Sequence, residues 1–445
     1  MKVQIPKKNN NTMRLINIKI EIKRHLYFGK YICQSSLDSF AFAKDYVRII
    51  FFTMDRFIKP PTDSMKKLDA LADELRRRRY NQLGYPFDQE TSLSGFYQWL
   101  VDTKLCDLTL INVGDPYKTQ WDMLHTDEFE RACIDFLATA YGFGEDHWGV
   151  ISNGGTDGNM YGVYFGRKAL SAKSARPPIL YVSDEAHYSV KKLGDIQNIE
   201  TRTISAHENG QMDVADFERK LDATRPALVA IAIGGTFKGA IDNQKEIDAV
   251  LKKANPPAVY RHLDAALFGG YLPFLDDSEA REILDAEKMG FDSVAVSGHK
   301  FFGLNEPAGA FICRKETLSH MQNNPVPYLN GVIPTIACSR SGFDALKLYW
   351  RISTTGLDGY KAQAKAVLKN TEYFRNALEK RGVKTWVNKF SNTVIFPRPS
   401  DNAVHKYALA CNEDKFWGSL SHVVVMQYFT PDLCDSIAED IATLK

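Results

Sequence analysis

The segment SVAVSGHK, residues 293–300, points to the fold class of this 445-residue chain. It is a short apolar run that predicts a buried strand, followed by a glycine turn, a histidine and a lysine. Similar runs on either side of it end in polar or small residues, and they are WGVIS (148–152), ILYVS (179–183), LVAIAIG (228–234), VYRHLDAA (259–266) and AGAFICR (308–314). Helix-like segments separate several of these runs, which indicates an α/β fold with a mostly parallel sheet covered on both faces.

The regions on either side of these strands have different patterns. Residues 65–79 and 127–141 carry apolar residues at helical spacing, and Thr126 is the predicted N-cap of the second helix. From about residue 340 a long helical stretch leads to short strands and a closing helix. The domains we expect are therefore a poorly ordered basic extension (1–53), an N-terminal helical segment (54–106), a large α/β domain (107–338) and a smaller C-terminal α+β domain (339–445).

Composition and charge exclude several classes of protein. The chain is 44% hydrophobic and 25% charged, as in folded globular proteins. Residues 1–53 hold ten Lys or Arg against three Asp or Glu, whereas the remainder holds 46 against 51. This mildly acidic body argues against a nucleic-acid partner. No apolar run reaches the roughly 18 residues of a membrane span, so we expect no membrane association.

Three interpretations of residues 1–53 compete. The segment is poor in acidic residues, as a mitochondrial transit peptide is, but Arg is scarce and Ser is ordinary. A secretory signal would need a longer apolar stretch and a small-residue cleavage site. We favour a poorly ordered extension or an upstream start that is not normally used, with Met54 opening the body of the protein.

The chain has seven cysteines, which is an odd number, and no two of them form a CxxC motif. This usage indicates a reducing compartment, for which we predict the cytoplasm. It argues against a disulfide framework and against a Cys-rich zinc site, and we predict no metal.

Two residues at strand ends point to the chemistry. Lys300 follows a buried strand, where a partly desolvated lysine can act as a Schiff-base nucleophile. Asp264 ends the run HLDAA (262–266), and a carboxylate followed by small residues can lie beside a flat ring. Each residue has an ordinary alternative, since most lysines are solvated and an Asp here can cap the next helix. An Asp that keeps a pyridine nitrogen protonated is what makes pyridoxal phosphate an electron sink.

Three further motifs follow strands. GGTDGN (154–159) lies between a strand and a helix, where Gly154, Gly155 and Thr156 can form an anion site. It is neither a Walker loop nor a GxGxxG motif. His187 is placed to stack on a planar cofactor, and Thr236 lies at another strand end. A phosphate site, a stacking residue, Asp264 and Lys300, in this order along one parallel sheet, together predict a pyridoxal-phosphate enzyme.

The chain resembles the group II pyridoxal-phosphate amino-acid decarboxylases of the fold-type I superfamily, near the bacterial histidine decarboxylases and plant serine decarboxylases. The resemblance spans about residues 60–445. Its motifs are NVGDPY (112–117), HTDEFE (125–130), NGGTDGNMYG (153–162), DEAHYSVKKL (184–193), GGTFKGAID (234–242), HLDAALFGGYLPF (262–274), VSGHKFFG (296–303) and SRSG (339–342). It implies a seven-stranded sheet in the cofactor-binding domain, and a homodimer or larger homo-oligomer with shared active sites.

The resemblance also implies residue roles. Lys300 would bind the cofactor covalently, Asp264 would pair with the pyridine N–H, and His187 and Ala266 would pack on opposite ring faces. The cofactor phosphate would be held by Gly155, Thr156, Ser297, His299 and, from the neighbouring subunit, Ser339. Thr236 would approach the ring hydroxyl or the substrate carboxylate. Tyr328, in a loop that runs to Cys338, is a candidate proton donor.

Three departures from the family pattern bear on the substrate. Asp157 replaces a usual Glu, GLNEPAG (303–309) replaces a Pro- and Cys-containing stretch, and SRSG is followed by Phe343-Asp344-Ala345. We expect these positions near the substrate entrance. The main hypothesis is decarboxylation of L-histidine to histamine and CO2. The alternatives are decarboxylation of serine or another small polar or acidic amino acid, another pyridoxal-phosphate reaction such as transamination or carbon–carbon lysis, and a catalytically inactive scaffold.

Overall fold

The computed structural model describes residues 60–118, 124–321, 325–329 and 331–443. The predicted extension, residues 1–53, lies outside the described residues. By its internal contacts the chain divides into two units, residues 1–76 and 77–445. The described part of the first unit is mostly helix α3 (Thr62–Arg77), whose ion pairs Lys66–Asp63 and Arg76–Asp73 each join residues three apart.

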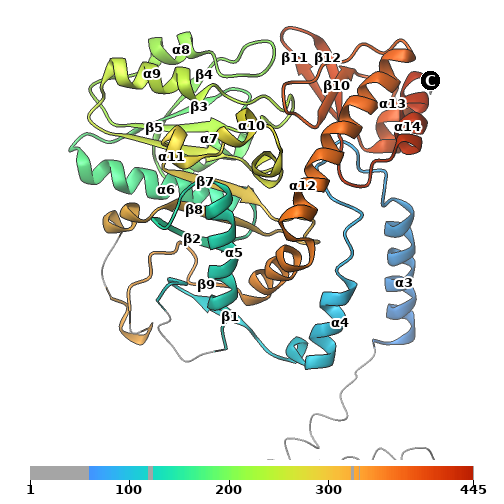
Figure 1. Ribbon diagram of the computed structural model, residues 1–445, viewed down its shortest axis with the longest axis horizontal. Coiled ribbons are helices and arrows are strands. Elements are labelled where there is room, and N and C mark those ends of the chain that lie inside the picture. The colour runs from blue at the N-terminus through green and yellow to red at the C-terminus, as the bar shows by residue number, and fades with distance from the viewer. Residues whose placement is uncertain (1–59, 119–123, 322–324, 330, 444–445) are drawn as a thin grey trace, which may run out of the picture. The chain divides into compact units, whose positions relative to one another are not determined.

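A seven-stranded sheet forms the centre of the second unit (Figure 1). Its strand order is β2-β8-β7-β6-β5-β3-β4, and β8 is antiparallel to both of its neighbours while the other pairs are parallel. The strands are β2 (His147–Ser152), β3 (Ile179–Ser183), β4 (Glu200–Ile204), β5 (Ala227–Ala232), β6 (Val259–Asp264), β7 (Ser293–Ser297) and β8 (Gly309–Arg314). The mostly parallel seven-stranded sheet expected from the sequence is confirmed.

Alternate residues of the central strands enter two different cores, because successive side chains of a strand point to opposite faces. Leu180 and Val182 of β3 pack with helices α6 (Gly155–Lys173) and α7 (Tyr188–Ile196). Ile179 and Tyr181 pack in the larger core, which includes residues of α5 (Asp127–Ala140), α8 (Val214–Lys220) and α9 (Gln244–Ala254). Helices therefore cover both faces of the sheet, which explains its continuous apolar strands.

A smaller C-terminal α+β domain follows the sheet (Figure 1). The 39-residue helix α12 (Gly342–Lys380) leads into it and breaks at Gly356, whose φ of +63° is left-handed. Three antiparallel strands in the order β10-β12-β11 form its sheet. Its elements are β10 (Thr393–Pro397), α13 (Asp401–Tyr407), β11 (Ala410–Asp414), β12 (Gly418–Val424) and α14 (Pro431–Thr443). We call residues 381–443 the C-terminal domain.

Short elements complete the unit. Strand β1 (Ile111–Val113) pairs antiparallel with β9 (Ser339–Ser341). The others are α4 (Ser94–Thr103), α10 (Ser278–Glu282), α11 (Ala286–Met289) and the 3-10 helices η1 (Leu105–Asp107), η2 (Phe268–Gly270), η3 (Leu272–Phe274), η4 (Lys315–His320) and η5 (Pro327–Leu329). None of the helices in the described ranges is both long and apolar enough to cross a membrane.

One local prediction needs correction. Thr126 does occupy the N-cap position of α5, but its side chain does not cap the helix. Its hydroxyl lies 3.0 Å from Asn112 Oδ1 and 2.9 Å from the Gly342 carbonyl oxygen instead. The tertiary partners have therefore displaced the local capping bond.

Candidate active site

A cavity of about 480 Å³ lies where β5, β6 and β7 end and α6 begins. This is where open α/β sheets bind ligands. Nine of the residues predicted from the sequence line it, and they are Gly155, Thr156, His187, Thr236, Asp264, Ala266, Ser297, His299 and Lys300. The structure thus brings together side chains that lie far apart in the sequence.

One end of the cavity suits a phosphate. Helix α6 begins at Gly155, so its first backbone N–H groups and its positive dipole end lie at the cavity wall. A Cβ on Gly155 would come within 2.8 Å of Ser297 Oγ, and Gly154 has a φ of +101°, so both positions require glycine. Ser297 Oγ is buried and has no hydrogen-bond partner among the described residues. A phosphate oxygen would satisfy that hydroxyl, so the residues present fit the group.

Lys300 and Asp264 are the lysine and the carboxylate of the cavity wall. Lys300 is half-buried at the turn after β7, and Asp264 is the last residue of β6. Burial lowers the pKa of Lys300, while the negative charge of Asp264 raises it. One oxygen of Asp264 accepts a hydrogen bond from the Ala266 N–H at 3.3 Å, and Ala266 also lines the cavity. A lysine with a lowered pKa has a larger neutral, nucleophilic fraction.

His187 is held in place by its own helix. It is the N-cap residue of α7, and its Nδ1 lies 2.7 Å from Ser189 Oγ and accepts the Ser189 N–H at 3.3 Å. Burial lowers the pKa of His187, Asp264 raises it and Lys300 lowers it. A largely neutral imidazole fixed at Nδ1 therefore lines the cavity, as the predicted stacking role requires.

Several cavity residues were not predicted. Residues 84–87, Gly-Tyr-Pro-Phe, reach the cavity from the stretch between α3 and α4, and His422 reaches it from β12. Both ring nitrogens of His422 face backbone carbonyl oxygens, at 2.7 Å from Phe237 and 3.1 Å from Gly84. The Gly and Pro in residues 84–87 interrupt the helical pattern and were the available signal. Nothing in the sequence around His422 separates it from an ordinary strand residue.

Two predicted residues lie outside this cavity. Tyr328, in η5, is 72% exposed, and Ser339 is exposed on β9. Neither lines the cavity formed by this chain.

Residues 303–309 do not line the cavity either. Asn305 instead bonds Tyr97 of α4, and Glu306 forms an ion pair with Lys347 of α12. Part of this stretch packs against those helices, and its Ala308 carbonyl oxygen lies 3.1 Å from Nδ1 of the cavity residue His299. The expectation that it lies near the substrate entrance stays a prediction.

A buried polar network accounts for three motifs that do not reach the cavity. Arg340 donates to both oxygens of Glu130 at 2.9 Å, and Asn112 Nδ2 donates to the same carboxylate at 2.7 Å. Glu130 also accepts the N–H of Ile151, near the end of β2 and just before the glycine turn. The motifs NVGDPY, HTDEFE and SRSG therefore meet at one buried carboxylate.

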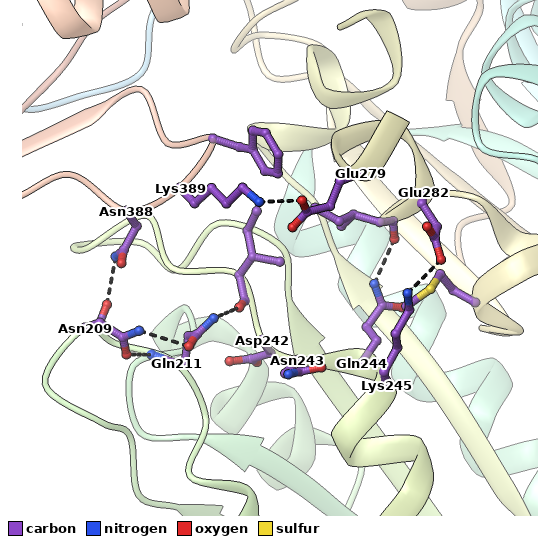
Figure 2. A pocket seen from close by; sticks show the side chains of 14 residues that line it. Asn209, Gln211, Asp242, Asn243, Gln244, Lys245, Glu279, Glu282, Asn388 and Lys389 are labelled. Carbon is purple, nitrogen blue, oxygen red and sulfur yellow. Dashed lines mark hydrogen bonds and ion pairs between the residues drawn. The ribbon is translucent and has the colours of Figure 1, made fainter. Parts of the chain in front are cut away.

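A second cavity, of about 390 Å³, has a different character (Figure 2). Its polar side chains are paired among themselves or with nearby backbone. Lys389 pairs with Glu279, Lys245 pairs with Glu282, and Gln244 donates to the Ile283 carbonyl oxygen. None of the residues predicted to be functional lines it.

The fold and the first cavity together define a pyridoxal-phosphate enzyme of the α/β class. The family described as the pyridoxal-dependent decarboxylase conserved domain matches residues 125–396. The chain belongs to that family. It is therefore an amino-acid decarboxylase, and its cofactor is pyridoxal 5'-phosphate.

Curated relatives match over most of the chain. Serine decarboxylase 3 of Oryza sativa subsp. japonica is 33% identical over 80% of this chain and 76% of its own length. Histidine decarboxylase of Solanum lycopersicum is 31% identical over 87% and 91%, and that of Mesorhizobium japonicum is 31% identical over 85% and 97%. The relatives thus include decarboxylases of two different amino acids.

Solved structures share the fold. L-methionine decarboxylase from Streptomyces sp. 590 superposes with a TM-score of 0.72 at 21% identity, over 87% of this chain and 96% of that one. Glutamate decarboxylase of Lactobacillus brevis gives a TM-score of 0.70 at 18% identity, over 88% and 95%. At these identities the likeness establishes the α/β architecture with its smaller C-terminal domain.

Proposed function

We propose that the protein decarboxylates L-histidine to histamine and CO2. The observation that carries this proposal is the charge of the cavity wall. Among its described lining residues, Asp264 and Lys300 are the only Asp, Glu, Lys or Arg. Because the cofactor engages both, no counter-ion remains for an acidic or a strongly basic substrate side chain. The wall also contains Tyr85, Phe87 and Phe237, which can pack on a planar imidazole.

The roles proposed for the phosphate end follow its geometry. The first N–H groups of α6, the Thr156 hydroxyl and Ser297 Oγ would bind the phosphate oxygens, with His299 beside them. When bound, pyridoxal phosphate supplies a conjugated system that accepts the electron pair left at Cα as CO2 departs. Anchoring the phosphate fixes where that system lies between the strand ends.

The remaining residues would bind, orient and hold protons. Asp264 would hold a proton on the pyridine nitrogen, which keeps the ring electron-accepting. His187 and Ala266 would confine the ring between them. Lys300, with its lowered pKa, would provide a neutral amine for the covalent link to the cofactor. Thr236, exposed at the cavity wall, would orient the substrate carboxylate.

We also propose a homodimer with shared active sites. Ser339 and Tyr328 are exposed and lie outside the cavity of their own chain, so both are available to a site on another copy. Ser339 would then bind the cofactor phosphate of the neighbouring subunit, and Tyr328 would deliver the proton to Cα. The cysteine usage supports a cytoplasmic location.

Serine is the second candidate substrate, because a relative at 33% identity is named a serine decarboxylase. The purified protein, loaded with pyridoxal phosphate, should be tested against all common L-amino acids for CO2 release, with the amine identified by mass. We expect kcat/KM to be highest for histidine. A higher value for serine would support the second candidate. A higher value for glutamate or lysine would contradict both, and with them the argument from cavity charge.

A further inference from the structure

Lys238 is a buried cation beside the active site. It follows Thr236 by two residues, and its side chain is only 1% exposed. Its ammonium group lies 3.3 Å from Glu185 Oε1, forms an ion pair with Asp414, and donates to the Glu208 carbonyl oxygen at 3.1 Å. The three N–H donors of the lysine therefore have three acceptors.

The partners of Lys238 come from separate parts of the fold. Glu185 belongs to the loop after β3 and precedes the cavity residue His187 by two positions. Asp414 is the last residue of β11 in the C-terminal domain. Burial acts to raise the pKa of Asp414, but the hydrogen bonds from Lys238 and from the Phe416 and Trp417 N–H groups outweigh it, so the pKa is lowered. Asp414 thus faces Lys238 as a carboxylate.

The C-terminal domain holds the same two loops at other points. Asn388 donates to the Lys238 carbonyl oxygen at 2.8 Å, and His422 Nδ1 lies 2.7 Å from the Phe237 carbonyl oxygen. Lys415, next to Asp414, pairs with Asp184 at 3.3 Å. Ion pairs therefore join the turn between β11 and β12 to both loops. Asp414 pairs with Lys238 of the loop that carries Thr236, and Lys415 pairs with Asp184 of the loop that carries His187.

We propose that Lys238 is a positioning residue that holds His187 and Thr236 at their places in the cavity and couples both to the C-terminal domain. The proposal rests on the cofactor and substrate roles proposed above for those two residues. Lys238 lies behind the cavity wall rather than on it, so it acts through Glu185 and through its own chain.

The geometry favours positioning over stability alone. Replacing a buried ion cluster by apolar groups is often neutral for stability, whereas removing one charge leaves the others unpaired. Each loop carries a residue that lines the cavity, His187 in one and Thr236 in the other. A shift of either loop would move His187 or Thr236 while leaving the sheet intact.

The test compares Lys238→Met with a control at another contact of the C-terminal domain, Lys389→Met. Lys389 also joins the C-terminal domain to the large domain, through Glu279, but it lies at the second cavity (Figure 2). The readouts are the dissociation constant of pyridoxal phosphate, the circular dichroism of the bound cofactor, and the melting temperature of the apoprotein. We expect K238M to weaken cofactor binding by about tenfold or more, as loss of an orienting partner does, and to change the dichroism. K389M should change neither. Wild-type binding and dichroism in K238M would overturn the proposal.

A charge-compensated variant separates positioning from stability. In K238M/E185Q/D414N the unpaired carboxylates are gone, so the melting temperature should recover. The cofactor dichroism should stay altered, because the link between the loops is still missing. Recovery of both would show that Lys238 is needed only for charge balance, and would overturn the proposal.

Two more variants keep the result decisive. If K238M does not fold, Asp414→Asn removes only the C-terminal partner and leaves Lys238 paired with Glu185. It should still alter the dichroism, and an unchanged spectrum would refute the coupling. His187→Ala tests the role on which the proposal rests. Unchanged cofactor binding in H187A would refute that role itself. Weakened binding in H187A together with wild-type behaviour of K238M would refute only the inference about Lys238.

Discussion

The active-site cavity and the second cavity are similar in volume but opposite in how their polar groups are satisfied. The active-site cavity contains a buried hydroxyl, Ser297 Oγ, without a partner among the described residues, and a lysine whose pKa is lowered by burial. In the second cavity Lys389 and Lys245 are paired with glutamates (Figure 2). Volume alone therefore does not distinguish the two cavities. What distinguishes them is that the active-site cavity contains polar groups that the protein leaves unsatisfied, and a bound ligand could satisfy those groups.

The largest effect should come from removing Lys300 from the active-site cavity. Lys300→Ala should abolish decarboxylation and the covalent attachment of the cofactor, since no other described lysine lines that cavity. Lys245→Ala, the matched change in the second cavity, should retain wild-type kcat/KM. Comparable loss of activity in both variants would remove the distinction between the cavities.

Asp264→Asn should have the next largest effect. The amide no longer keeps the pyridine nitrogen protonated, so we expect a loss of about 3–4 kcal/mol of transition-state stabilisation, or several hundredfold in kcat. Single-turnover measurement with saturating cofactor separates this loss from weak binding. A kcat within a few-fold of wild type would argue against the role of Asp264.

Subunit mixing tests whether the active-site cavity is completed by a second chain. Lys300→Ala and a deletion of residues 328–338 should each be inactive. In a mixed dimer with shared sites, one site takes both defects and the other takes neither. Mixing at equal ratio with random exchange should therefore restore up to about a quarter of wild-type activity. If exchange is demonstrated and no activity returns, each chain works alone.

The pH dependence of cofactor attachment tests the electrostatics of Lys300. Burial lowers the pKa of Lys300 and Asp264 raises it, so the rate of covalent attachment to the apoprotein should rise with pH to a midpoint below 10.5. Asp264→Asn removes the charge that favours the ammonium form, so its midpoint should lie at lower pH still. A midpoint that moves upward in this variant would contradict the arrangement.

The smallest effect is expected in the second cavity. Glu279→Gln breaks the ion pair with Lys389, whose side chains are 63% and 64% exposed. Exposed pairs of this kind contribute about 0–1 kcal/mol to stability. Urea unfolding should show a change within that range, with kcat/KM unaltered. A large fall in activity would mean that the second cavity contributes to the reaction.

Much of the active-site cavity can be predicted from the sequence, because strand-end motifs of a parallel sheet converge in space. The runs at 148–152, 179–183 and 293–298 correspond to β2, β3 and β7 within one or two residues. Strand β4, Glu-Thr-Arg-Thr-Ile, was missed because it is an edge strand whose polar residues give no apolar run. Strand β11 was missed for the same reason.

Other parts of the site could not be predicted because they depend on tertiary contacts. His422 and residues 84–87 come to the cavity from the C-terminal domain and from the stretch before α4, and neither carries a strand-end motif. In the sequence, nothing distinguishes Lys238 from an ordinary charged loop residue. Only the folded chain shows that Glu185 and Asp414 lie beside it. The roles of Tyr328 and Ser339, and the domain boundaries at 106 and 338, stay predictions.

The most direct test of the central claim is to identify the lysine that carries the cofactor. The loaded protein should be reduced with borohydride, digested, and its phosphopyridoxyl peptide sequenced by mass spectrometry. We predict a single labelled peptide containing Lys300, and loss of that label when Ser297 and Thr156 are both replaced by Ala and cofactor is limiting. Stoichiometric label on any other lysine, such as Lys245 or Lys389 at the second cavity, would contradict the assignment of the active site.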